Sequence, residues 1–382
     1  MSETKSIPSR VIDFLGSFTL ACILFILLFL LTLFGTLEQQ HASLHDVRTK
    51  YFDSPFFLTE YGIPMPGASL LLGILFVNLV VGGMLRMRRS WTRLGIFVIH
   101  IGIAFLLLSS LVEGIFSKKG LMTVWEGDSK SVFESSEYWD VSILEQLPEG
   151  RQRSFTIPSG SLPGPGEQAR FRAQGLPFEV VLAGHLRNCR PRRAPAGSDS
   201  TEGFVLQEFP PDKDEVAQNI PGVTVTLVGR DVRREAVVWG FPEMPPYVTT
   251  IDGRNWAVEI HRRRWPLPFS VTLRDFQFEM YPGTGTAKSF SSDVTRVENN
   301  VAQDVHISMN DPMRHGGYIF YQSGYGPQEP QPGERMYSTF SVVENPADRG
   351  PWIAVVTIFL GLAGHMIYKL LRHMDAGSRR RA

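Results

Sequence analysis

The chain has 382 residues, and 38 basic side chains balance 38 acidic ones, so the formal net charge is zero. Because bulk attraction to nucleic acid needs a basic chain, this composition excludes nucleic acid as an expected partner. The apolar residues are unevenly distributed, with three long runs before residue 117 and a fourth near the C-terminus. The pattern predicts a polytopic α-helical membrane protein with one large domain outside the membrane.

Four transmembrane helices are predicted, at about residues 18–37, 67–85, 94–116 and 351–371. Each run is close to the ~20 residues that cross a hydrocarbon core of ~30 Å. The first run is longer than the apolar part of a typical signal peptide and no clear cleavage site follows it, so we expect it to remain as a helix. The rest of the chain then forms an N-terminal segment, a large domain and a short tail, at residues 1–16, 117–350 and 372–382.

Basic residues in short segments predict the orientation of these helices. The segment between the second and third runs has no acidic residue and carries Arg86, Arg88, Arg89 and Arg93. The C-terminal end is also basic, with Lys369, Arg372, Arg379, Arg380 and Arg381. We therefore expect both chain termini in the cytoplasm, and the large domain on the other side of the membrane.

The large domain is predicted to be β-rich, because short β-type runs alternate with turn residues between residues 120 and 343, as in GVTVTLVG and AVVWGF. In DVHISM (304–309) apolar and polar residues alternate with a period of two. A Pro- and Gly-rich segment, NDPMRHGG, separates it from YIFYQSGYG (318–326). We predict that these two runs pair as a β-hairpin.

Two further features of this domain concern its organisation. LPFEVVL (176–182) resembles LPFSVTL (267–273), which indicates either equivalent strands of two related β-units or a chance similarity. Residues 187–214, rich in Arg, Pro and Ser, are predicted to form an exposed loop or an insertion within the domain. The two cysteines, Cys22 and Cys189, provide neither a disulfide framework nor a CxxC redox motif, so we do not expect a thiol–disulfide exchanger.

Two histidines lie inside predicted transmembrane helices. His100 is ~9 Å from the cytoplasmic end of the third helix, and His365, ~21 Å along the fourth, is predicted to lie at the same depth. An ionisable side chain in a membrane usually faces the interior of a helix bundle, and imidazoles from two helices at one level could be axial ligands of a haem. The alternative is that each histidine only makes an interhelical hydrogen bond.

Most other candidate residues lie on the predicted outer side. His41 and His45 have the i, i+4 spacing of a metal or haem pair if a helix contains both, although solvated surface residues are the alternative. His306 and His315 flank the predicted hairpin turn, where solvent exposure is expected. Glu113 and Glu126 could contact a partner or simply face water, and His185, His261 and His373 give no signal. We find no nucleophile elbow, P-loop or HExxH motif.

The chain resembles the ResB family of cytochrome c biogenesis proteins along its whole length. The resemblance lies in LGS and GTLEQ around the first helix, FVNLVVG in the second, His100 in the third, GLMTVWEGDSKSV at the start of the outer domain, LPFSVTLRDFQFEMYPGTGTAKSFSSDV (267–294) and HISMNDPMRHGGYIFYQSGYG (306–326). It implies a bacterial inner-membrane protein with a periplasmic domain. Such a protein is a subunit of a system II cytochrome c synthase, acting with a CcsA/ResC-type membrane protein.

The resemblance also implies roles for the two histidines. His100 would be an axial ligand of the iron of haem b in transit, and His365 lies in the last helix, whose histidine is thought important in the family. The subunit would bind and transport haem and present it to apocytochrome c, contributing to haem lyase activity by positioning rather than as a nucleophile. The competing hypothesis is a membrane-anchored scaffold that binds no haem and assembles envelope or respiratory proteins.

Overall fold

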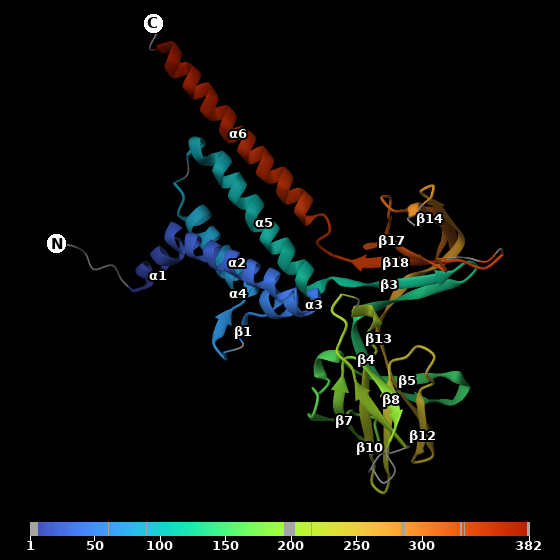
Figure 1. The fold of residues 1–382 in the computed structure, drawn as a ribbon. Coiled ribbons are helices and arrows are strands. Elements are labelled where there is room, and N and C mark those ends of the chain that lie inside the picture. The colour runs from blue at the N-terminus through green and yellow to red at the C-terminus, as the bar shows by residue number, and fades with distance from the viewer. Residues whose placement is uncertain are drawn as a thin grey trace. The chain divides into compact units, whose positions relative to one another are not determined.

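Two units make up the chain: residues 1–118 together with residues 344–382, and residues 119–343. The first is helical and the second is β-rich (Figure 1). The computed structural model describes residues 7–379 apart from residues 60, 89, 195–202, 215, 284–286, 329, 330 and 332. Arg89, Arg380 and Arg381, which contribute to the predicted orientation, lie outside the described residues.

The helical unit contains four helices that are long and apolar enough to cross a membrane, at Phe18–Glu38, Ala68–Leu85, Trp91–Phe116 and Gly350–Met374. This confirms the four predicted apolar helices. The elements of the unit are α1 (Ile7–Leu15), α2 (Phe18–Glu38), α3 (Leu44–Val47), the π-helical η1 (Arg48–Asp53), the strands β1 (Phe56–Leu58) and β2 (Pro64–Pro66), α4 (Ala68–Asn78), the π-helical η2 (Leu79–Leu85), the 3-10 turn η3 (Trp91–Arg93), α5 (Leu94–Phe116) and α6 (Gly350–Arg379).

A buried asparagine ties the second apolar helix to the start of the first. Asn78, between α4 and η2, donates hydrogen bonds from its amide nitrogen to the carbonyls of Leu15 (2.6 Å) and Ser17 (2.9 Å). These carbonyls flank the break between α1 and α2, and the Ser17 hydroxyl accepts from Leu20 N as the N-cap of α2. The LGS and Asn-Leu motifs therefore stabilise one helix junction.

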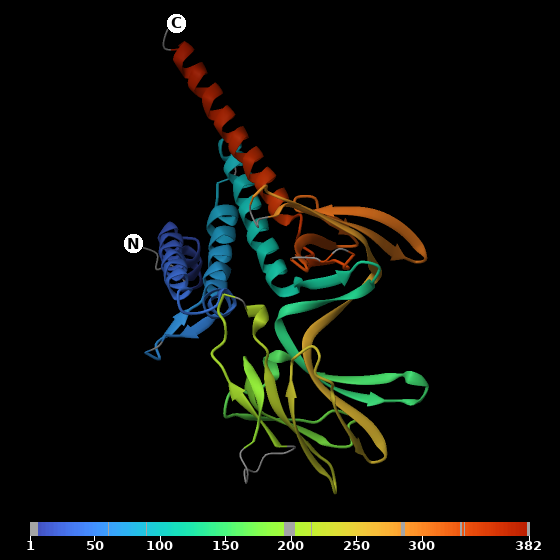
Figure 2. The same cartoon turned by 45° about the vertical axis from the view of Figure 1, so that its right-hand side comes forward.

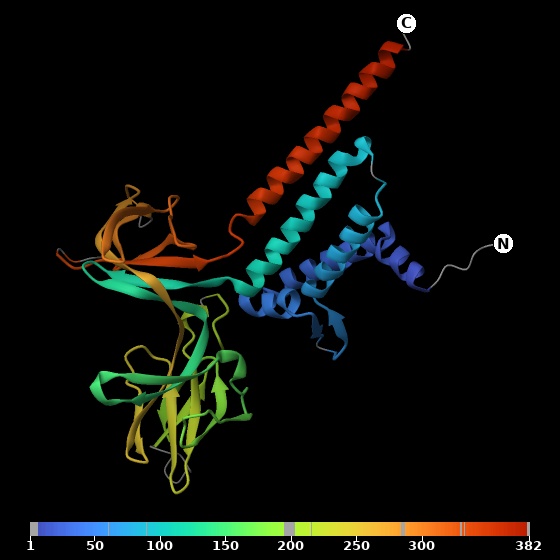
Figure 3. The same ribbon diagram turned by 180° about the vertical axis from the view of Figure 1, so that it is seen from behind.

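Helices α5 and α6 pack with their backbones in close contact, and Figures 1 and 3 show them side by side. A Cβ atom at Gly95 would lie 2.6 Å from the Gly361 carbonyl, and one at Gly102 would lie 2.6 Å from Ile358 Cγ1. Small residues are what permits such an approach between apolar helices in a membrane. Larger side chains at Gly95 or Gly102 would therefore push the two helices apart.

The β-rich unit is built around two long strands, β4 (Ser129–Gln146) and β13 (Arg254–Met280), which pair antiparallel (Figure 2). Its other elements are β3 (Lys118–Trp125), η4 (Pro148–Gly150), β5 (Gln152–Ile157), η5 (Ser159–Ser161), β6 (Gln168–Phe171), β7 (Glu179–Leu186), β8 (Cys189–Arg193), β9 (Phe204–Glu208), η7 (Val216–Gln218), β10 (Gly222–Val228), β11 (Arg233–Trp239), β12 (Tyr247–Ile251), β14 (Ala287–Glu298), β15 (Val301–Ser308), β16 (Met313–His315), β17 (Tyr318–Gly326) and β18 (Tyr337–Glu344).

These strands form a ten-stranded sheet in the order β15-β14-β13-β4-β3-β18-β17-β16, with β12 and β5 as side branches, and a four-stranded sheet in the order β11-β10-β7-β6. One end of β13 contributes Trp256 and Val258 to a core with the four-stranded sheet. The other end contributes Phe269 and Val271 to a second core with β14, β17 and β18. The alternation of buried and exposed residues along β13 supplies both cores from one strand.

The second core contains a buried polar cluster. Ser292 Oγ on β14 lies 2.8 Å from Gln322 Oε1 on β17 and 2.9 Å from Ser338 Oγ on β18, and Gln322 Nε2 donates to Ser338 Oγ at 2.7 Å. All three residues are buried. Although β14 is separated from β17 and β18 in the order of the sheet, the sheet curls so that they meet in this core.

The prediction that residues 304–309 and 318–326 pair with each other as a hairpin is wrong. The strand β15 pairs with β14 through a turn at Asn299 and Asn300, which both have positive φ angles. The strand β17 instead forms a tight hairpin with β16 through Gly316 and Gly317, also with positive φ angles. Two separate two-residue turns therefore replace the single long turn that the sequence suggested.

Two other expectations for this unit are also corrected. Residues 187–214 are not simply a loop, since β8 and β9 within them pair antiparallel and Cys189 is fully buried. Burial, with the nearby Glu208, raises the pKa of the Cys189 thiol to about 12. The similar runs 176–182 and 267–273 are not equivalent strands, because the first leads into β7 of the four-stranded sheet and the second lies in the middle of β13.

Candidate functional site

His100 contacts the end of the second apolar helix. Its Nδ1 lies 2.8 Å from the carbonyl oxygen of Gly83 in η2. The helix ends at Leu85, so the Gly83 carbonyl is one of the last four, which lack an intrahelical partner. Glycine is needed here because a Cβ atom at Gly83 would lie 2.7 Å from His100 Nδ1.

This hydrogen bond determines which tautomer the neutral imidazole adopts. A carbonyl oxygen can only accept, so Nδ1 of His100 carries the proton and donates to Gly83. In the neutral ring Nε2 then keeps its lone pair. A metal-binding histidine is usually oriented by the same arrangement, in which the nitrogen away from the metal donates to a backbone carbonyl.

His365 lies on α6, which packs against α5, but it is not level with His100 along the two helices. A Cβ atom at Gly95 would lie 2.7 Å from His365 Cβ, whereas Gly361, one turn earlier on α6, is the residue close to Ile99. His365 is therefore level with Gly95, about 7.5 Å along α5 from His100. This differs from the predicted equal depth. Among the described residues, the buried Nδ1 of His365 has no hydrogen-bond partner.

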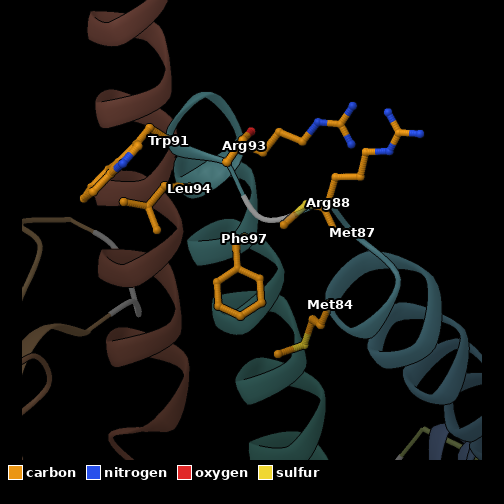
Figure 4. A pocket seen from close by; sticks show the side chains of 8 residues that line it. Met84, Met87, Arg88, Trp91, Arg93, Leu94 and Phe97 are labelled. Atoms are coloured by element: carbon orange, nitrogen blue, oxygen red, sulfur yellow. The ribbon is translucent and has the colours of Figure 1, made fainter.

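A cavity of about 570 Å³ lies between the end of η2, the following loop and the start of α5 (Figure 4). Its lining combines apolar and basic side chains: Met84, Met87, Arg88, Ser90, Trp91, Arg93, Leu94 and Phe97. Figure 4 shows Met84 and Phe97 projecting from neighbouring helices, while Arg88 and Arg93 extend in a common direction. Met84 directly follows Gly83, so this cavity adjoins the His100 contact.

The predicted pair His41 and His45 is not held on one helix. His45 belongs to the short helix α3, whereas His41 lies in the turn before it. The i, i+4 geometry that a shared ligand would need is therefore not formed. Within the described part of the chain, no three His, Cys, Asp or Glu side chains gather as a metal-binding group.

Histidines of the β-rich unit mostly have side-chain partners. His306 Nδ1 lies 2.8 Å from Asp293 Oδ1 on the paired strand, and His315 Nε2 lies 2.7 Å from Glu298 Oε2. His306 is exposed, as expected, whereas His315 is half-buried against Phe269. These are pairings that the sequence did not predict.

The three remaining histidines differ in their hydrogen bonds and exposure. Both ring nitrogens of His261 are used, because Nδ1 donates to the Arg262 carbonyl and Nε2 lies 2.8 Å from Ser142 Oγ. Burial, with the nearby Arg187, lowers the pKa of His185, whose buried Nε2 has no partner among the described residues. His373 is exposed at the end of α6.

Glu126 has a structural role within the β-rich unit. Its carboxylate accepts hydrogen bonds from the backbone amides of Phe276 and Met336, both at 3.0 Å. It therefore links the end of β3 to β13 and to the residue before β18, contacts that the sequence did not predict. For Glu113, in the last turn of α5, a partner contact stays a prediction.

Comparisons with known proteins bear on both units. Residues 247–344, which span β12 to β18, match the ResB-like family. Protein NrfI from Wolinella succinogenes is 21% identical over 299 residues, which are 78% of this chain and 30% of that protein. The chain thus spans only part of the relative it matches. His100 and the cavity lie outside the family match, so their chemistry rests on the geometry given above.

Proposed function

We propose that this chain, a ResB-like protein, serves cytochrome c biogenesis by binding haem within its helical unit and passing it on for attachment to apocytochrome c. The family match and the similarity to NrfI support a role in cytochrome c biogenesis. Four helices that could cross a membrane support a membrane protein. The large β-rich unit is proposed to lie outside the cytoplasm.

The hydrogen bond from His100 to Gly83 is the observation that carries the haem-binding part of the proposal. It orients the imidazole and leaves Nε2 with a free lone pair in a segment where a polar side chain is costly. Haem iron takes a neutral imidazole as an axial ligand. His100 Nε2 is therefore the proposed ligand, and Gly83 is the residue that positions it.

The opposite axial ligand is proposed to come from a CcsA/ResC-type partner rather than from His365. His365 is level with Gly95, so about five residues of helix separate it from His100. To share an iron with His100, His365 would have to bridge this offset of about 7.5 Å along the helix pair. A ligand on another chain, which is free of this offset, would fit the site better.

The chain's own contribution is proposed to be ligation and positioning. Thioether formation requires reduced apocytochrome thiols next to the haem vinyl groups, so orientation of the two substrates is the main requirement. Both cysteines of this chain are poorly suited to act as nucleophiles: Cys22 lies within an apolar helix and the Cys189 thiol is buried with a pKa of about 12. We assign docking of the partner and of apocytochrome c to the β-rich unit.

Absorption spectroscopy tests this proposal on the full chain, purified alone and after co-expression with its partner. We expect a low-spin Soret band that is lost in His100→Ala and kept in His373→Ala, which removes an exposed histidine. An unchanged band in His100→Ala would assign haem to another site. Absence of haem from both preparations would favour the scaffold hypothesis instead.

A further inference from the structure

We infer that Arg88 and Arg93 bind the two carboxylates of a porphyrin whose ring occupies the cavity beside His100. This inference rests on the proposed function for the identity of the ligand. It adds a second binding element, which recognises the acidic groups of the ligand rather than its iron.

Arg88 and Arg93 differ from their neighbour Arg86 in ion pairing. Arg86 forms an ion pair with Asp13 at 2.6 Å. Neither Arg88 nor Arg93 has an ion-pair partner among the described residues, and both line the cavity. Two guanidinium groups are thus available to an anion, and guanidinium matches a carboxylate with two parallel hydrogen bonds.

The rest of the cavity is suited to an apolar, planar body. Met84, Leu94 and Phe97 contribute apolar lining, and Trp91 adds an aromatic side chain. A volume of about 570 Å³ is within the range of small-molecule sites. Apolar walls with two cations on one side match a ligand that is hydrophobic over most of its surface and carries two acidic groups.

The cavity also lies close to the proposed iron ligand along both helices. Phe97 precedes His100 by three residues, so the two side chains lie on one face of α5 about 4.5 Å apart along its axis. On the facing helix, Met84 follows Gly83 directly. One ligand can therefore contact both the arginines and His100.

Arginines in a short loop between two apolar helices can also act through their charge alone. They can orient the helices across the membrane, and they can attract anionic lipid headgroups. Replacement by lysine preserves the charge that both of these roles need. It removes the paired hydrogen bonds of the guanidinium group, so it separates them from carboxylate recognition.

The probe is metal-free protoporphyrin IX, whose binding requires no iron ligand. Fluorescence titration uses the full chain in phosphatidylcholine nanodiscs, with empty nanodiscs as the background. We expect Arg88→Gln and Arg93→Gln each to weaken binding by about fivefold and the double variant by about twentyfold. Arg372→Gln, a matched loss of one exposed charge outside the cavity, should leave the affinity unchanged.

The dimethyl ester of the same porphyrin separates carboxylate recognition from effects of charge or packing. The wild-type chain should bind the ester about twentyfold more weakly than the acid, and the arginine variants should lower its affinity no further. The double lysine variant should lie between the wild type and the double glutamine variant.

Equal affinities for acid and ester, or an equal effect of Arg372→Gln, would overturn the inference. The same titration is repeated in nanodiscs that contain anionic phosphatidylglycerol. If the arginine variants weaken binding only there, the arginines bind lipid headgroups, and the inference is overturned. Because the probe lacks iron, its binding does not depend on His100 ligation. The porphyrin titration and the haem experiment can therefore fail independently of each other.

Discussion

The helical and β-rich units differ in what their histidines contact. In the β-rich unit, His306 and His315 pair with carboxylates and His261 uses both ring nitrogens. In the helical unit, His100 donates to a backbone carbonyl through Nδ1, and Nε2 retains its lone pair. Polar groups that are paired within the fold stabilise it, whereas a nitrogen left over at a fixed orientation is available to a ligand.

The same difference extends to packing. Two apolar cores and the cluster of Ser292, Gln322 and Ser338 stabilise the β-rich unit. Helices α5 and α6 instead meet through the backbones of glycines such as Gly95 and Gly102. A substitution in these cores of the β-rich unit should therefore change stability, and one near His100 should change ligand binding.

The largest effect is expected for Ser292→Ala, which removes the central hydroxyl of the buried cluster. It leaves the side chains of Gln322 and Ser338 without one of their partners, so the free energy of unfolding should fall by about 2 kcal/mol. Thermal unfolding of the full chain, followed by near-ultraviolet circular dichroism, measures this. Thr295→Ala, which removes a surface hydrogen bond to Asp304, should have little effect. A changed haem spectrum in Ser292→Ala would contradict the separation of roles.

Gly83→Ala should act in the opposite way, weakening haem binding with little change in unfolding. The new Cβ atom would lie 2.7 Å from His100 Nδ1 and must displace the ring. We expect about a tenfold loss of haem affinity, or about 1.4 kcal/mol, by titration of the purified chain.

Gly73→Ala is the matched control on the same apolar helix, because a Cβ atom there would meet no described atom within 4 Å. It should leave haem affinity unchanged. Equal effects of the two substitutions would mean that helix properties, and not the contact with His100, decide binding.

The smallest effect concerns His185, the exception among the histidines of the β-rich unit. Burial and Arg187 lower its pKa in the folded chain, while the unfolded value is about 6.5. The stability from the neutral ring is therefore complete above the unfolded pKa and is lost as the pH falls through the folded pKa. The unfolding temperature should be lower at pH 5.5 than at pH 7.5. His185→Gln should make this difference measurably smaller, by at most about 3 °C. An identical pH dependence in His185→Gln would disprove this role, and the exposed His306→Gln serves as the control.

The sequence predicted what depends on local pattern. Apolar runs of sufficient length identified four helices. Alternating residues identified β15, and the β-type run after a Pro- and Gly-rich turn identified β17. Strand partners were not predictable in this way, because the period of two determines which face is buried but not which strand lies alongside. The signal for the β14–β15 turn was present in Asn299 and Asn300, since asparagine tolerates positive φ angles.

The candidate site was predicted only in part. His100 was identified because a lone histidine stands out in an apolar run, but its contact with Gly83 joins two helices and no local pattern reports it. The equal depth of His365 was inferred from helix ends, whereas the close contact at Gly95 determines the actual register of α5 and α6. Arg88 and Arg93 were interpreted as orientation signals, since their place beside a cavity depends on how η2 and α5 meet.

Chemical rescue tests the central claim, that His100 Nε2 is a haem ligand oriented by Gly83, most directly. In His100→Gly the low-spin Soret band should disappear, and added imidazole should restore it by occupying the space of the missing side chain. His306→Gly, which removes a paired histidine of the β-rich unit, should keep the band without imidazole. A band that persists in His100→Gly without imidazole would contradict the claim.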